Sequence, residues 1–186
     1  YGKEQFIADQ AELHEEQNVR RTIFDEMSKR SSTIEDNNAK VFTPIPEAWS
    51  NFDFNFSRAP IFYPLNNLTI EKGNFTSAKF YGNADFAEVI FIEKADFSGA
   101  GFTQETSFKD ATFAQEASFK GATFTHNADF EGATFTQEAS FKDATFTQNV
   151  FFNGATFTQN VYFLGTIFAQ DAYFSETTFT QDTYFL

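Results

Sequence analysis

The side chains best suited to chemistry in this 186-residue chain are carboxylates that recur at multiples of eleven residues. They are Glu105, Glu116, Glu138, Asp171 and Asp182. Two carboxyl groups that flank a bound sugar can serve as the catalytic pair of a glycosidase. A fixed recurrence instead spreads such groups along a repetitive structure, so we expect solvated charges at its corners and no catalytic pair.

Other reactive residue types are scarce. The chain has no cysteine and two histidines, which excludes disulfides, cysteine nucleophiles and thiolate metal sites. His14 falls among helix-forming residues and His126 replaces a repeated glutamine, so we expect both at the surface. No phosphate-binding glycine loop, nucleophile elbow or His-Glu metal motif occurs. The sequence predicts a non-enzymatic protein without catalytic, cofactor or metal sites.

Phenylalanine, with 29 residues, dominates the composition. From Phe75 to Phe185 it recurs 21 times at intervals that alternate between five and six residues without exception. Short strands separated by corners fit this spacing, whereas a 3.6-residue helical period does not. Alanine stands two residues before phenylalanine in 13 of the 21 units, so a small and a large side chain share the inward face.

The residues that close the five-residue units favour sharp corners, because glycine and, less readily, aspartate adopt left-handed backbone conformations. They are Gly99, Asp110, Gly121, Gly132, Asp143, Gly154 and Gly165.

This pattern resembles the pentapeptide-repeat family, whose units read Ala-(Asp/Asn)-(Leu/Phe)-x-x. Ala84-Asp85-Phe86, Ala95-Asp96-Phe97 and Ala128-Asp129-Phe130 match it. The resemblance implies an all-β solenoid, a right-handed quadrilateral β-helix with four units per turn. Four units here sum to 22 residues instead of 20, and we expect the extra residues at two opposite corners.

The 21 units predict slightly more than five turns, roughly 25 Å long at about 4.8 Å per turn. We expect the phenylalanine rings to stack in columns, and their burial, about 1.5–3 kcal/mol each before entropy is subtracted, to drive folding. The predicted structural core contains Phe97, Phe102, Phe108, Phe113, Phe119, Phe124, Phe130, Phe135, Phe141 and Phe146.

The N-terminal part has a different composition. Residues 1–40 are expected to form a helical arm, with a helix over about 4–30 whose thin apolar stripe suits docking on another surface. A polar linker is expected from Ser31 to Pro46.

Residues 41–72 are expected to link the arm to the repeats and to cap the solenoid, which we place at 73–186. Strict alternation over 51–57 predicts a strand with three phenylalanines on one face. Leu65 and Ile70 suggest two degenerate units before the regular repeat.

Toward the C-terminus the outward position before phenylalanine becomes aromatic in the five-residue units, and further outward apolar residues join it. Exposed aromatic ladders usually mark a contact surface, so we expect another protein, a second copy or further sequence to cover these turns. The predicted protein interface contains Phe151, Tyr162, Leu164, Ile167, Tyr173, Tyr184 and Leu186.

The net charge of −13 argues against direct binding of nucleic acid, and no apolar run is long enough to span a membrane. We expect a soluble protein, cytoplasmic by default, although a lost targeting peptide is compatible with the sequence. Function is expected to be that of a scaffold that binds proteins through a rigid acidic β-helix and its C-terminal aromatic surface.

Two alternatives remain open. Some pentapeptide-repeat proteins are DNA mimics that occupy a type II topoisomerase, and the net charge of −9 over residues 75–186 suits that role. Threonines on both sides of an inward phenylalanine, such as Thr123 and Thr125, would stack into arrays similar to the ice-binding faces of β-helical antifreeze proteins. Ala114, Ile167 and Ala169 interrupt these arrays.

Overall fold

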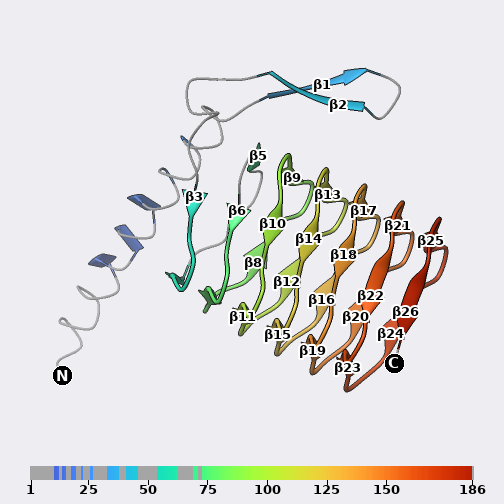
Figure 1. Ribbon diagram of the computed structural model, residues 1–186. Coiled ribbons are helices and arrows are strands. Elements are labelled where there is room, and N and C mark those ends of the chain that lie inside the picture. The colour runs from blue at the N-terminus through green and yellow to red at the C-terminus, as the bar shows by residue number, and fades with distance from the viewer. Residues whose placement is uncertain are drawn as a thin grey trace.

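The computed structural model describes the following residues: 11–12, 14–15, 18–19, 22, 26, 33–37, 41–45, 54–62, 69–70 and 73–185. Four parallel β-sheets, stacked coil upon coil, make up the walls of a solenoid (Figure 1). We number them walls 1 to 4 in the order in which the chain passes from β6 to β9. Walls 1 and 3 are therefore opposite each other, as are walls 2 and 4.

Each wall is a ladder of very short strands. Wall 1 contains β3 (Phe54–Asn55), β6 (Gly73–Asn74), β10 (Ala95–Asp96), β14 (Ala117–Ser118), β18 (Ala139–Ser140), β22 (Val161–Phe163) and β26 (Thr183–Phe185). Wall 2 contains β4 (Pro60–Ile61), β7 (Lys79–Phe80), β11 (Gly101–Phe102), β15 (Thr123–Phe124), β19 (Thr145–Phe146) and β23 (Ile167–Phe168). Wall 3 contains β8 (Ala84–Asp85), β12 (Thr106–Ser107), β16 (Ala128–Asp129), β20 (Val150–Phe151) and β24 (Ala172–Tyr173). Wall 4 contains β5 (Thr69–Ile70), β9 (Ile90–Phe91), β13 (Thr112–Phe113), β17 (Thr134–Phe135), β21 (Thr156–Phe157) and β25 (Thr178–Phe179).

The register of the ladders confirms a parallel all-β solenoid of about five turns. Ala95 pairs with Ala117, and Ala117 pairs with Ala139, so one coil takes 22 residues. The same step holds in the other walls from the second coil onward. The first coil is shorter, because Phe54 pairs with Gly73, only 19 residues later. No described feature tests the predicted right-handedness.

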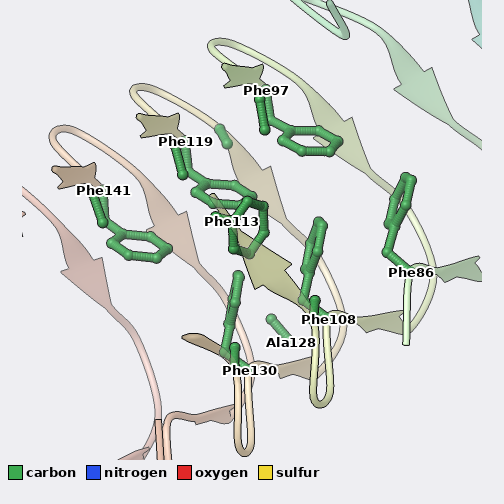
Figure 2. Close-up of a cluster of buried hydrophobic side chains, with 14 of the residues drawn as sticks. Phe86, Phe97, Phe108, Phe113, Phe119, Ala128, Phe130 and Phe141 are labelled. Atoms are coloured by element: carbon green, nitrogen blue, oxygen red, sulfur yellow. The ribbon is translucent and has the colours of Figure 1, made fainter. Parts of the chain in front are cut away.

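The core consists of stacked phenylalanine rings. Phe97 and Phe119 in wall 1 lie with ring centroids 5.1 Å apart and planes 1° from parallel. From wall 3, Phe108 meets both rings edge-on, at 5.3 and 5.2 Å (Figure 2). All ten phenylalanines expected in the core are at most 1% exposed. Offset stacking along a wall and edge-to-face packing across the tube are the two geometries that aromatic rings favour.

Buried alanines fill the space between the rings, as Ala95, Ala117 and Ala139 do in wall 1. The one buried polar side chain among the described residues, Thr106, occupies an equivalent position and donates its hydroxyl to the carbonyl of Gln104 at 3.3 Å.

Tight turns form two of the four corners. Between walls 1 and 2, the Ala100 amide donates to the Phe97 carbonyl at 3.0 Å while Gly99 takes a φ of 66°. This geometry is that of a type II turn, which needs a left-handed third residue. The predicted corner residues all have positive φ. Four further residues, which are neither glycine nor aspartate, also have a positive φ: Arg58, Ser77, Glu88 and Glu176. The other two corners, which are opposite each other, carry the extra residue.

The prediction of a polar linker from Ser31 to Pro46 is wrong, because this segment contains an antiparallel hairpin. Strand β1 (Thr33–Asn37) pairs with β2 (Val41–Ile45), Thr33 opposite Ile45 and Asn37 opposite Val41. The β-branched residues of both strands, separated by three residues that begin with an asparagine, account for the pairing.

The prediction of one strand over 51–57 is also wrong, because the observed strand is shorter. Strand β3 ends at Asn55, and the chain turns at Ser57 and Arg58, where the Ala59 amide donates to the Phe56 carbonyl at 3.0 Å. The alternation marks a repeat unit instead, because Phe56 stacks on Phe75 at 5.3 Å.

Other N-terminal expectations are tested less fully. Ile70 is buried in the wall 4 column, whereas Leu65 lies outside the described residues. In the predicted arm, residues 11–12, 14–15, 18–19, 22 and 26 have helical backbone. A continuous helix over 4–30 and the capping role of 41–72 stay predictions.

Replacing a mid-solenoid ring should destabilise the whole stack. Phe119→Ala removes a fully buried ring with partners on all four walls, so we expect unfolding to cost about 3–5 kcal/mol less. Urea denaturation measures this. The outward Thr123→Ala should change the unfolding free energy by no more than about 0.5 kcal/mol. Similar losses for both variants would contradict the inward stacking.

Two glycines separate backbone conformation from packing. A Cβ at Gly101 or at Gly121 would meet nothing within 4 Å, but only Gly121 has a left-handed φ, of 64°. We expect Gly101→Ala to raise the unfolding free energy by about 0.4–1 kcal/mol and Gly121→Ala to lower it by about 1–2 kcal/mol. Equal denaturation midpoints for the two variants would show that this corner is not constrained.

Candidate protein-binding surface

The outward column of wall 3 changes from small and polar to aromatic. Asp85, Ser107, Asp129, Phe151 and Tyr173 follow one another in register. The rings of Phe151 and Tyr173 stack at 5.1 Å with planes 6° apart. Two aromatic side chains therefore stand together outside the core.

Wall 1 makes the same change on the opposite side of the tube. Ser118 and Ser140 are followed in register by Tyr162 and Tyr184, whose rings stack at 4.9 Å. The Tyr162 hydroxyl donates to Glu138 Oε1 at 3.4 Å, and the Tyr184 hydroxyl donates to Asp182 Oδ2 at 3.2 Å.

The residues predicted as one interface thus lie on different walls. Successive five-residue units alternate between walls 1 and 3, so an eleven-residue spacing in the sequence becomes two separate ladders. Leu164 lies at the corner after wall 1, and Ile167 points outward from wall 2 with 56% of its surface exposed. Leu186 lies outside the described residues.

The aromatic residues replace side chains that support the corners. In earlier coils Asp85, Asp96 and Asp129 each accept a hydrogen bond from the backbone amide two residues later, at 3.0, 2.9 and 2.8 Å. Phenylalanine has no acceptor, and the tyrosine hydroxyls of Tyr173 and Tyr184 reach carboxylates instead. In these C-terminal coils the local hydrogen bond is lost, and aromatic surface is gained on the outside of the tube.

A groove of about 820 Å³ runs along wall 3; we call it the wall 3 groove. Asp85, Glu105 and Asp129 bring carboxylates to it, Asn83 and Asn127 bring amides, and Phe151 closes one end. Among the residues that the structure describes, no lysine or arginine lines it.

The matching wall 1 groove is smaller, about 360 Å³, and carries both signs of charge. Lys94, Glu116, Glu138 and Lys142 line it, and Lys94 Nζ lies 3.5 Å from Glu116 Oε2. The two grooves occupy equivalent positions, one eleven-residue module apart, so their difference arises from sequence alone.

Burial raises the pKa of the Asp129 carboxyl group above its ordinary value, although the hydrogen bond from the Glu131 amide opposes the shift. At the corner next to it, Lys109 Nζ bonds Glu131 Oε1 at 2.9 Å, and this hydrogen bond raises the pKa of Lys109. A hydrogen bond to Asp171 likewise raises the pKa of Tyr173.

The carboxylates singled out as possible catalysts divide between two opposite corners. Glu105 and Asp171 precede wall 3, whereas Glu116, Glu138 and Asp182 precede wall 1. Glu116 and Glu138 are neighbours in one column, so they line one side of a groove and do not flank it. Within the described residues no three metal-binding side chains gather. His14 and His126 are both exposed.

The threonine columns stack as the repeat predicts, Thr112 to Thr134 to Thr156 to Thr178 in wall 4. Threonines that follow phenylalanine donate their hydroxyls to the preceding coil, as Thr125 does to the Phe102 carbonyl at 3.1 Å. These side chains thereby reinforce the ladder.

A family model described as "Pentapeptide repeats (9 copies)" matches residues 66–112, 97–145 and 141–185. Comparison with curated proteins finds no match, and neither does comparison with solved structures. Among the described residues, no helix has the length and apolar character needed to cross a membrane.

The raised pKa of Asp129 makes a prediction about stability. Its ionisation opposes folding at neutral pH, and this cost disappears as pH falls below the carboxyl pKa of both states. Asp129→Asn retains the Oδ1 acceptor, so we expect it to melt above the parent protein at pH 7 and level with it in acid. Thermal melts between pH 3 and 7 measure the difference. A variant less stable at pH 7 would contradict the argument.

Proposed function

The chain belongs to the pentapeptide-repeat family, and from that premise we propose that it is a non-enzymatic scaffold that binds another protein through the outward aromatic residues of its C-terminal coils. The observation that carries the proposal is the pair of outward stacks, Phe151 with Tyr173 and Tyr162 with Tyr184. Neither stack belongs to the core.

The exposure of these residues supports a binding role. Tyr173 is 40% exposed and Tyr184 is 38% exposed, although serine or aspartate serves the same positions in earlier coils. Tyrosine offers a partner a rigid apolar face and a hydrogen-bonding hydroxyl, which is why it is enriched where proteins bind one another. The partner would be a different protein or a second copy of the chain.

The rest of the molecule suits a scaffold. The tube is filled by its own rings, and its charged groups are distributed over its walls and corners. Function on such a fold must come from its surfaces. The predicted N-terminal helix would act as a docking arm beside the solenoid.

A second candidate function is DNA mimicry toward a type II topoisomerase. The favouring observation is the wall 3 groove, which is lined, within the described part of the chain, by three carboxylates and no cation. Lys94 and Lys142 on wall 1 weigh against a uniformly negative rod. Inhibition of gyrase supercoiling at micromolar protein would support mimicry, and its absence would reject it.

Site-specific photocrosslinking tests the scaffold proposal. A photoreactive phenylalanine analogue at position 162, 173 or 184 of the full chain should crosslink to one partner in the native cells, whereas the analogue at Ser118 should not. The double variant Tyr162→Ser, Tyr184→Ser introduces the serine found at positions 118 and 140 of the same column, so it should fold. It should reduce the crosslinking yield from position 173 only if one partner spans both walls. Equal yields at all four positions, or none, would overturn the proposal.

Sedimentation velocity distinguishes the two kinds of partner. If a second copy is bound, the parent chain should sediment as a dimer that the double serine variant converts to a monomer. If another protein is bound, both should sediment as monomers.

A further inference from the structure

We propose that the wall 3 groove binds an extended basic segment of a partner protein and that an arginine of this segment stacks on Phe151 beside Asp129. The inference rests on the proposed scaffold function and adds a site and a class of ligand to it. Its basis is the shape of the groove, the ring that closes it and the contrast with wall 1.

The ring of Phe151 is covered on one face and also contributes to the lining of the groove. Tyr173, in the next coil, stacks on one face at 5.1 Å. The other face is directed along the column toward Asp129, which pairs in register with Phe151, and Phe151 contributes to the groove lining. A guanidinium placed there would meet an aromatic face and a carboxylate together, which combines cation–π attraction with a charge-assisted hydrogen bond.

The length of the groove suits an extended peptide. Its lining runs from β8 through β12 and β16 to β20, four strands of one ladder, or roughly 14 Å at about 4.8 Å per step. About four or five extended residues cover that distance at about 3.3 Å each. Its cationic side chains would then face the part of the lining that contains Asp85, Glu105 and Asp129.

Charge selects a cationic segment. Lys109 is engaged with Glu131 at the neighbouring corner, and among the described residues no lysine or arginine lines the groove. Arginine suits the site better than lysine, because its planar guanidinium can stack on the ring and still donate to a carboxylate.

Wall 1 provides an internal comparison. Its groove has the same place in the repeat and also ends at an aromatic residue, Tyr162, yet Lys94 and Lys142 line it. Ion pairing with Lys94 occupies Glu116, and the Tyr162 hydroxyl occupies Glu138. A basic peptide should therefore discriminate between two grooves of one molecule.

Fluorescence anisotropy with the full chain tests this. The probe is a fluorescein-labelled hexapeptide that alternates arginine and serine, and lysine and glutamate versions accompany it. Asp85→Asn with Asp129→Asn retains both corner acceptors and should weaken arginine-peptide binding at least tenfold. Glu116→Gln with Glu138→Gln removes the same charge from wall 1 and should weaken it less than twofold. Phe151→Leu, which leaves every charge in place, should weaken it about two- to fivefold.

Equal losses from the two charge pairs would show nonspecific attraction and overturn the proposal, as would parent protein that fails to bind the arginine peptide. Equal affinity for the arginine and lysine peptides, together with unchanged affinity in the Phe151→Leu variant, would show that the ring is not part of the site. Melting curves establish that each variant folds. The Tyr162→Ser, Tyr184→Ser variant should bind the peptide normally, so loss of crosslinking at those tyrosines and loss of peptide binding are separate results.

Discussion

The distance between hydrogen-bonded strands governs this structure, because it is also close to the distance at which aromatic rings stack. Parallel strands lie about 4.8 Å apart. The ring centroids of Phe102 and Phe124 lie 4.6 Å apart, and those of Phe91 and Phe113 lie 4.8 Å apart. One ring per wall per coil therefore satisfies the backbone ladder and the core together. Ile61 and Ile70 take this position in the first coil, where they keep the ladder but add no ring to the stack. From Phe75 onward every unit supplies a phenylalanine and so satisfies both.

This constraint explains what sequence could and could not predict. Spacing in the sequence predicts the inward rings from Phe75 onward, the 22-residue coil and the corners at Gly99 or Asp110. Each of these features requires a particular residue type at a fixed position. Arg58 and Glu88 adopt the same left-handed corner without such a signal, because the ladder on either side holds them there. The hairpin at 33–45 could not be predicted from the repeat, because its strands lie outside the repeat and β1 is largely polar. Over 51–57, strict alternation is typical of one long strand. A two-residue strand between two corners produces the same pattern.

The surfaces were harder to predict than the core. An eleven-residue recurrence places Phe151, Tyr162, Tyr173 and Tyr184 in one line of the sequence, yet each module is half a coil. Their alternation between walls 1 and 3 follows only when the module is counted as half of a 22-residue coil. The grooves could not be derived at all, since their lining combines corner residues of one unit with wall residues of the next.

The half-coil symmetry also makes the charge distribution informative. Backbone, corner type and inward residues are nearly the same on walls 1 and 3, so folding alone makes no distinction between them. Of the residues described, lysines nevertheless line the groove of wall 1 and none lines that of wall 3. Asp129 stays in that groove although burial raises its pKa and makes its charge unfavourable for stability at neutral pH. Asp129 thus serves the corner through its hydrogen bond from the Glu131 amide and, beside an aromatic ring that the core does not need, also presents a carboxylate to the cationic ligand proposed for the wall 3 groove.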